Sequence, residues 1–221
     1  MKECAIWFLL LMGFSSSAQE AAIQSTQATT AKQYHVKDYP DGFYYTIDDF
    51  INKTSKPYPL LQKRMLYREQ RIPYDSDMDQ LFFFTASDTL KLKNVFAVSF
   101  RGNLYIQQKY MHKYASKEDK REDGDNSNSY HRVLKEGRFL YFEGAFANAW
   151  TKGFASYAGM PQSSVNQTKG VVFDVEKREF NFLRNCEDFN GFLKRMGSEE
   201  KADCAEYSIF KAREIIDRII R

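Results

Sequence analysis

The sequence predicts an α+β fold: an antiparallel β meander or roll of about six to eight strands, with a short N-terminal helix and two C-terminal helices. Three observations support this prediction. The chain contains 14 Tyr and 19 Phe, residue types that fill the faces of sheets. The segments with strand-like patterns follow one another through short connections, as antiparallel strands do. Two segments with helical signals then close the chain.

The composition is that of a globular chain, with 43% hydrophobic and 28% charged residues among 221. Its length suits one α+β domain of ordinary size, which we assign to residues 39–221. The 32 basic and 29 acidic residues leave a net charge of +3. Because a nucleic-acid-binding face needs concentrated positive charge, we predict no nucleic-acid partner.

Residues 1–18 have the pattern of a secretory signal peptide. Lys2 precedes an apolar core at 5–14, and small residues at 16–18 form a cleavage site. A membrane-spanning helix needs roughly 20 apolar residues, so an uncleaved anchor is the weaker alternative. Cys4 lies before the apolar core, whereas a lipoprotein cysteine would follow it. The sequence thus predicts an exported protein, periplasmic or extracellular, with no membrane span after cleavage.

The N-terminal part of the mature chain changes from polar to patterned near residue 39. Residues 19–38 are polar and aperiodic, and we predict a disordered lead. Thr46 is predicted to cap a short helix that ends before Pro57, with acidic residues in its first turn. Residues 60–79 have no clear pattern, and no element is assigned to them.

The clearest local signal is a hairpin within residues 91–110. A β-branched and aromatic run at 95–101 precedes Gly102-Asn103, a predicted two-residue turn, and the strand resumes at 104–107. Alternation predicts one face with Phe96, Val98, Phe100 and Tyr105, and the other with Val95, Ala97, Leu104, Ile106 and Tyr110. Because both faces are apolar, we expect the hairpin at the centre of the sheet, packed on both sides.

The remaining elements follow in order. Further strands are predicted at 80–86, 138–147, 171–174 and 179–183. The densely charged segment 112–130 is predicted to be a long mobile loop, and 148–170 an irregular connection. One helix at 187–196 stops at Gly197. The last helix, predicted from Asp203 to the C-terminus, carries an apolar stripe that docks onto the sheet.

Two cysteines remain in the predicted mature chain, Cys186 and Cys204. In an oxidising compartment two such cysteines tend to pair, and this disulfide would stabilise the fold by about 3 kcal/mol. A helix between them would separate their ends unless the chain folds back. Two unpaired buried thiols are therefore the alternative.

The sequence offers little recognisable chemistry. Its three histidines, His35, His112 and His131, lack a metal-binding spacing, and no nucleophile elbow or phosphate loop is present. We predict no catalytic, cofactor or metal site. The alternative is a hydrolase that uses the strand carboxylates Glu143 and Asp174 with His131, which requires these side chains to converge.

Several stretches resemble a family of uncharacterised exported proteins of Bacteroidota, a domain of unknown function. They are GFYYTIDDFINKT, VFAVSFRGNLYI, GRFLYFEGAF and VVFDVEKREFNFL, which together span most of residues 42–183. The resemblance implies export and a bacterial origin, and it carries no catalytic residue to transfer. Asp88-Thr89-Leu90 also resembles the short O-glycosylation sequon of exported Bacteroidota proteins, which marks Thr89 as a candidate acceptor.

These observations favour a non-catalytic envelope domain that binds a protein, a glycan or an apolar ligand. An apolar ligand could lie between the aromatic sheet and a helix. An interaction protein that uses residues 148–160 as an exposed apolar patch is a further hypothesis. Because the central hairpin is predicted to be buried, we expect function in the irregular segments 111–130 and 148–170.

Overall fold

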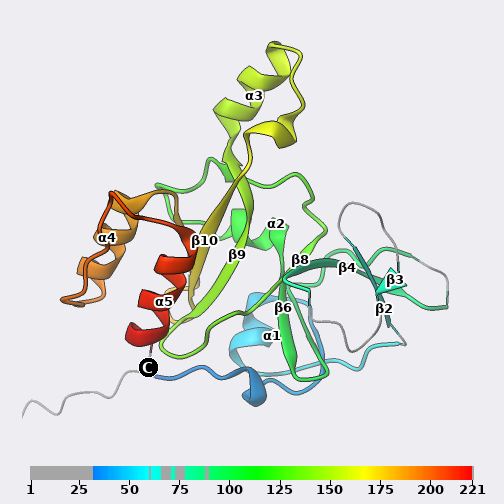
Figure 1. The fold of residues 1–221 in the computed structure, drawn as a ribbon. Helices are drawn as coiled ribbons and strands as arrows, with labels where there is room; N and C mark the ends of the chain where they lie inside the picture. Colours follow the sequence, from blue (N-terminus) through cyan, green and yellow to red (C-terminus); the bar gives the residue numbers. More distant parts are fainter. Residues whose placement is uncertain (1–31, 60, 66–70, 73–77, 88–89, 221) are drawn as a thin grey trace, which may run out of the picture. The chain divides into compact units, whose positions relative to one another are not determined.

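The computed structural model describes residues 32–59, 61–65, 71–72, 78–87 and 90–220. These residues form an α+β fold with antiparallel strands, as predicted, but the strands belong to two sheets and not to one (Figure 1). The large sheet has the strand order β1-β5-β6-β8-β4-β2-β3, and the small sheet has the order β11-β10-β9-β7. The predicted signal peptide, most of the predicted lead, and Thr89 lie outside the described residues.

The elements are η1 (Val36–Asp38), β1 (Gly42–Tyr44), α1 (Ile47–Ile51), β2 (Leu61–Met65), β3 (Arg71–Ile72), β4 (Gln80–Thr85), β5 (Ala97–Phe100), β6 (Asn103–Gln107), α2 (Gln108–Lys113), β7 (Glu122–Asp123), β8 (Tyr130–Arg132), β9 (Leu140–Asn148), α3 (Ala149–Tyr157), η2 (Gln162–Val165), β10 (Gln167–Asp174), β11 (Glu179–Leu183), α4 (Cys186–Arg195) and α5 (Ile209–Ile219).

The N-terminal helix forms as the sequence predicts. The Thr46 side chain accepts from the Asp49 backbone N–H, and the Asp49 carboxylate accepts from the Thr46 N–H, each at 3.0 Å. This capping box satisfies donors that the first turn of a helix leaves unpaired. The domain begins earlier than predicted, however. Tyr34 is buried and its N–H donates to the Gly137 carbonyl, so residues 34–38 belong to the fold.

The β5–β6 hairpin is internal to the large sheet, with β1 on one side and β8 on the other. The two turn residues are Arg101 and Gly102, both with positive φ, whereas the sequence predicted Gly102 and Asn103. Positive φ at both positions is typical of a type I′ turn, whose twist matches that of the strands. Asn103 instead pairs with Phe100 as the first residue of β6.

Both faces of this hairpin are buried, which confirms its predicted central place. Ala97, Leu104 and Ile106 join the core that contains residues of both sheets. Val98, Phe100 and Tyr105 join a separate core of the large sheet. Val95 and Phe96 have exchanged the predicted faces because they precede the first residue of β5, where strict alternation begins.

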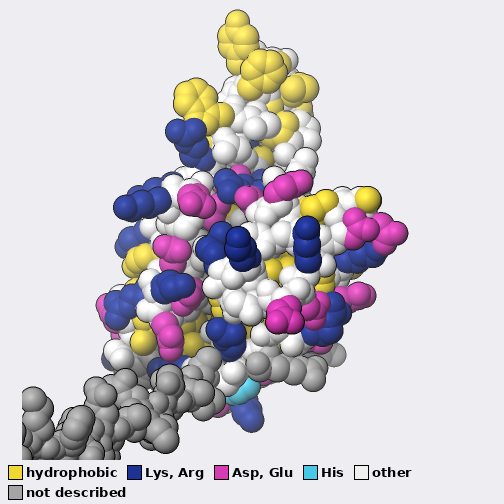
Figure 2. Space-filling model, turned by 90° about the vertical axis from the view of Figure 1, so that its left-hand side faces the viewer, with side chains coloured by type: hydrophobic (Ala, Val, Ile, Leu, Met, Phe, Trp, Pro, Cys, Tyr) yellow, Lys and Arg dark blue, Asp and Glu magenta, His cyan; other side chains and the backbone are white. Residues whose placement is uncertain are grey.

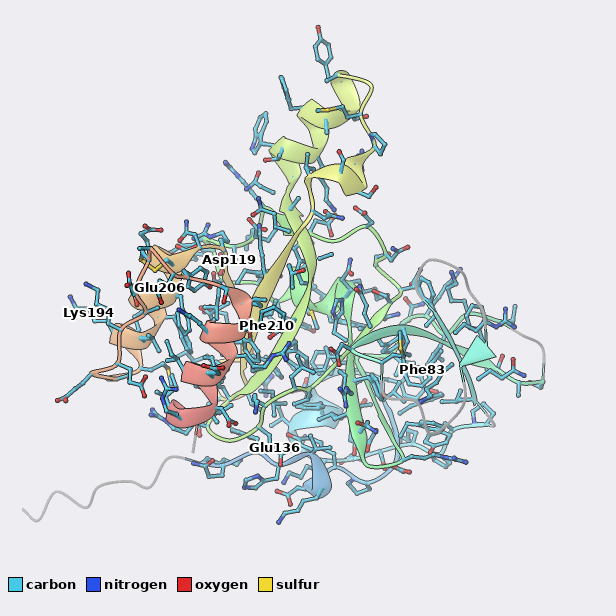
Figure 3. All side chains as sticks on the ribbon, in the orientation of Figure 1. Phe83, Asp119, Glu136, Lys194, Glu206 and Phe210 are labelled. Atoms are coloured by element: carbon cyan, nitrogen blue, oxygen red, sulfur yellow. A yellow bond between two sulfur atoms is a disulfide. The ribbon has the colours of Figure 1, made fainter. Side chains whose placement is uncertain are left out.

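The large sheet curls into a roll. In a flat sheet β4 and β5 would lie roughly 14 Å apart, because β6 and β8 separate them. Nevertheless the ring of Phe83, labelled in Figure 3, lies 5.9 Å from that of Phe100 and 5.3 Å from that of Tyr130. These aromatic side chains fill the interior of the curl, which explains why this face is buried.

The small sheet is buried on both faces. One face packs against the large sheet and α1, where the Phe173 ring lies 6.0 Å from Phe96 and 5.9 Å from Phe50. The other face packs against α4 and α5, with Val172 in the same core cluster as Phe189 and Ile216. Figure 1 shows both C-terminal helices on this side.

Two predicted irregular segments are ordered. The segment 112–130 contains the end of α2, strand β7 and two buried carboxylates, Asp119 and Glu122. The prediction of a long mobile loop was therefore wrong, because the fold pairs these charges instead of leaving them in water. The segment 148–170 contains α3, which begins where the Asn148 side chain accepts from the Trp150 N–H at 3.0 Å.

The C-terminal helices follow the prediction with one change of boundary. Helix α4 ends before Gly197, whose φ of +70° suits the residue after a helix. Helix α5 begins after Ser208, whose hydroxyl accepts from the Lys211 N–H. It does not begin at Asp203, because that carboxylate accepts from the Ala205 N–H in a preceding turn.

A disulfide joins Cys186, at the first turn of α4, to Cys204 in the segment between α4 and α5. Their Cα atoms lie 5.4 Å apart because the chain folds back after α4. The Asn190 side chain supports this return, since it donates to the Ala202 carbonyl and accepts from the Ala202 N–H.

We predict that Cys186→Ala combined with Cys204→Ala lowers the free energy of unfolding by about 3 kcal/mol, because the disulfide restricts the unfolded chain. Chemical denaturation of the parent and the variant under oxidising conditions measures this difference. A reductant should destabilise the parent to a similar degree and leave the variant unchanged. Equal stability of the two proteins would contradict the prediction.

Candidate functional site

His131 lies on β8 and is fully buried. Its Nδ1 lies 3.0 Å from the Glu143 carbonyl oxygen, which can only accept, so Nδ1 carries the proton. Its Nε2 is then free to accept from the Gln80 side-chain amide at 3.1 Å. The ring also stacks on Phe146. Burial lowers the pKa of His131 to about 4, so the neutral form dominates at neutral pH.

The Glu143 carboxylate points to the opposite face of β9. It accepts two hydrogen bonds from the Arg213 guanidinium, at 2.7 and 2.5 Å, and a third from the Tyr141 hydroxyl at 2.9 Å. The bidentate arginine and the phenol therefore use three of the roughly four acceptor positions of this carboxylate. This arrangement fixes α5 against the small sheet.

Asp174 is the last residue of β10, beyond Gly170, the residue that pairs with Glu143. Glu143 pairs with Gly170, and Asp174 follows four residues later, roughly 13 Å along the strand. The Asp174 carboxylate accepts from the Lys177 N–H at 3.0 Å and forms an ion pair with its ammonium group. The structure therefore does not bring Glu143, Asp174 and His131 together, as the hydrolase alternative required.

Other candidate sites are small or incomplete. In the part of the chain that the structure describes, no three His, Cys, Asp or Glu side chains are grouped so that they could hold a metal ion. A cavity of about 150 Å³ lies between the small sheet and α4, lined in part by Phe139, Phe192 and Met196. Binding pockets for small molecules usually measure about 300–1,000 Å³, so this cavity is small for an apolar ligand.

The most exposed apolar surface belongs to residues 148–166, which we name the arm. It consists of α3 and η2 between the paired ends of β9 and β10, and it stands away from the other helices (Figure 1). Trp150, Phe154 and Tyr157 on α3 are 72%, 68% and 90% exposed, and Met160 follows. Figure 2 shows hydrophobic side chains gathered over this end of the molecule.

The exposed aromatic side chains share one side of α3. At about 100° per residue, Trp150, Phe154 and Tyr157 point within a narrow sector, and Gly153 falls beside them. The two buried residues of this helix, Lys152 and Ala155, point the opposite way. We name the outward side the aromatic stripe. It also lines a shallow groove, to which Ala149 and Gly153 contribute.

Ion pairs of two buried lysines fix the base of the arm. The Lys152 ammonium group lies 2.9 Å from Asp125, which also accepts from the Asn166 amide at 2.7 Å. On β10, the buried Lys169 lies 2.6 Å from the buried Glu122 of β7. Both carboxylates come from the charged segment that follows α2. This segment therefore positions α3 and η2 relative to the rest of the domain.

Sequence reasoning identified residues 148–160 as an exposed apolar patch but missed the helix that displays it. Two signals were available. Asn148 is a favourable helix N-cap, and Trp150, Gly153, Phe154 and Tyr157 have the i, i+3, i+4, i+7 spacing of one helical face.

Comparison with known proteins gives no relative from which a function could be transferred. The chain matches no protein-family model, no curated protein and no solved structure. Within the described residues, no helix is both long and apolar enough to cross a bilayer. The geometry of the arm is therefore the main guide to function.

We predict that His131 makes the stability of the fold depend on pH. Its pKa falls from 6.5 to about 4 on folding, so the unfolded chain binds a proton more readily. Stability is complete above pH 6.5 and decreases as the pH falls toward 4, by up to about 3 kcal/mol.

Denaturation curves between pH 7 and pH 4 measure this effect. His131→Phe should flatten the pH dependence of the free energy of unfolding in this range, because the side chain no longer titrates. The control Phe210→Ala changes an exposed residue without a titratable group and should keep the slope of the parent. An unchanged slope in His131→Phe would show that other groups cause the pH dependence.

Proposed function

We propose that this chain is an exported, non-catalytic binding protein of the cell envelope, and that the arm is its contact surface. The observation that carries the proposal is the aromatic stripe: Trp150, Phe154 and Tyr157 are largely exposed on one side of α3. The envelope location rests on the predicted signal peptide and on the resemblance to exported Bacteroidota proteins.

The aromatic stripe has no evident role in folding. The packed side of α3 is already occupied by Lys152 and Ala155, and the three core clusters contain none of the stripe residues. Scattered apolar side chains on a surface are ordinary, whereas a contiguous aromatic patch usually marks an interaction site. Aromatic residues are also enriched in the centres of binding interfaces.

The chemistry of the stripe favours an apolar partner over a glycan. Sugars stack on aromatic rings but also require directional hydrogen bonds to their hydroxyl groups. The stripe itself offers two polar atoms, the Trp150 indole N–H and the Tyr157 hydroxyl, and the Arg121 guanidinium lies beside it. Burial of three aromatic side chains instead supplies a large, non-directional stabilisation.

Hydrogen–deuterium exchange tests this proposal. When an envelope fraction of the native host is added, we expect slower exchange in peptides that cover 149–160. The variant Trp150→Ala/Phe154→Ala/Tyr157→Ala should lose this protection, because it removes the apolar surface and leaves the packed side of α3 intact.

The matched control is Phe210→Ala on α5, because Phe210 is 67% exposed but lies away from the arm (Figure 3). This control should retain protection of the arm. Circular dichroism of each variant verifies that the fold is preserved. Protection of another surface, with unchanged exchange in the arm, would refute the proposal.

A further inference from the structure

The arm has the composition of a segment that enters the interface of a lipid bilayer. Resting on the proposed function, we propose that the arm binds a phospholipid membrane surface through the aromatic stripe and Met160. Trp and Tyr are enriched at membrane interfaces, where an apolar ring and a polar atom are both accommodated. The stripe contains one of each, together with Phe154.

The arm can leave water without dehydrating an unpaired charge. Among residues 148–166 the one charged residue is Lys152. Its ammonium group is buried on the opposite side of α3 and paired with Asp125 at 2.9 Å. The other polar groups of the arm are hydroxyls and amides, which cost far less to transfer than ions. An uncharged, aromatic projection therefore suits the interface of a bilayer.

The position of α3 makes the stripe accessible to a flat surface. The helix lies beyond the last residues that pair β9 with β10, Phe146 and Gln167. Figure 1 shows η2 beside α3, whereas α4 and α5 lie away from it. The packed side of α3 faces η2. The opposite side, which carries the aromatic stripe, can therefore lie in the plane of an interface, as amphipathic helices do.

Arg121 supplies a positive charge beside the stripe. Its guanidinium lies 5.9 Å from the centre of the Trp150 ring, and its backbone carbonyl accepts from the Ala149 N–H at 2.7 Å. Among the described residues, no carboxylate pairs with the Arg121 side chain. When Trp150 lies in the interface, Arg121 is therefore near the level of lipid phosphates, which guanidinium groups bind well.

A second copy of the chain is a weaker candidate for the partner. A fully exposed aromatic side chain buries about 150–250 Å², so three partly exposed rings contribute roughly 500 Å² per copy. Stable dimers bury about 800 Å² on each partner. A bilayer does not require this area, because each inserted ring contributes independently to partitioning.

Trp150 is a built-in reporter of binding. The chain has two tryptophans, Trp7 and Trp150, so a chain without residues 1–18 retains Trp150 alone. All three core clusters lie between Tyr34 and Ile220, which leaves the folded domain complete after this removal. The fluorescence emission of Trp150 is measured while this shortened chain is titrated with phosphatidylcholine vesicles, and separately with vesicles that also contain phosphatidylglycerol.

We expect the emission to shift to shorter wavelength with both vesicle types, and lipids brominated near the headgroup to quench it. Phe154→Ala/Tyr157→Ala keeps the reporter and should weaken partitioning about 100-fold, since each buried ring is worth about tenfold or more. Arg121→Gln should weaken binding to the vesicles with phosphatidylglycerol more than to the others. Phe210→Ala should bind like the parent.

Three outcomes would overturn this inference. Unchanged emission with both vesicle types, combined with protection of residues 149–160 by the envelope fraction, would indicate a protein partner and leave the proposed function standing. A shift that depends on protein concentration without vesicles, with a dimeric mass, would indicate a second copy. Unchanged emission without protection of the arm in either experiment would refute both the inference and the proposed function.

Discussion

Phe173 packs against aromatic rings from three separate parts of the chain, and this contact holds the two sheets together. Its ring stacks on Phe180 of the neighbouring strand at 4.3 Å. It also contacts Phe50 of α1, and Phe96, which precedes the central hairpin. Large rings at these distances contribute both burial and favourable edge and stacking geometry. The small sheet thereby gains a fixed position on the large one.

The arm depends on that fixed position. Strands β9 and β10 are held at one end between the aromatic core and the C-terminal helices. At their other end they continue into α3 and η2, where few apolar contacts are available. Two ion pairs fix this end instead: the buried pair of Lys169 with Glu122, and the pair of the buried Lys152 with the more exposed Asp125. Removing Glu122 or Asp125 is costly, because the lysine that it pairs with remains buried without a partner.

Local features of the fold could be read from the sequence because neighbouring residues determine them. Thr46 caps α1, Gly197 follows α4, and the alternation from Ala97 to Ile106 locates the central hairpin. The hairpin turn was misplaced by one residue, because Arg101 takes a positive φ, which is uncommon for residues other than glycine.

Features that depend on distant pairing could not be predicted. A run of charges such as residues 117–125 is normally solvated, and nothing local indicates that Glu122 meets Lys169 from 47 residues away. The buried environment of His131 likewise requires Gln80 and the Glu143 carbonyl, which come from two other segments. For the candidate site, composition indicated an exposed apolar patch, and the structure adds the helix that orients it.

In the proposed function, α3 is already formed before any partner binds, and the rest of the domain holds it so that the aromatic stripe is exposed. Backbone ¹⁵N relaxation of residues 149–157 in the unbound protein measures this most directly. The ion pairs at the base predict order parameters near those of the strands, about 0.85. Values below about 0.6 through α3, with the strands remaining rigid, would contradict the claim.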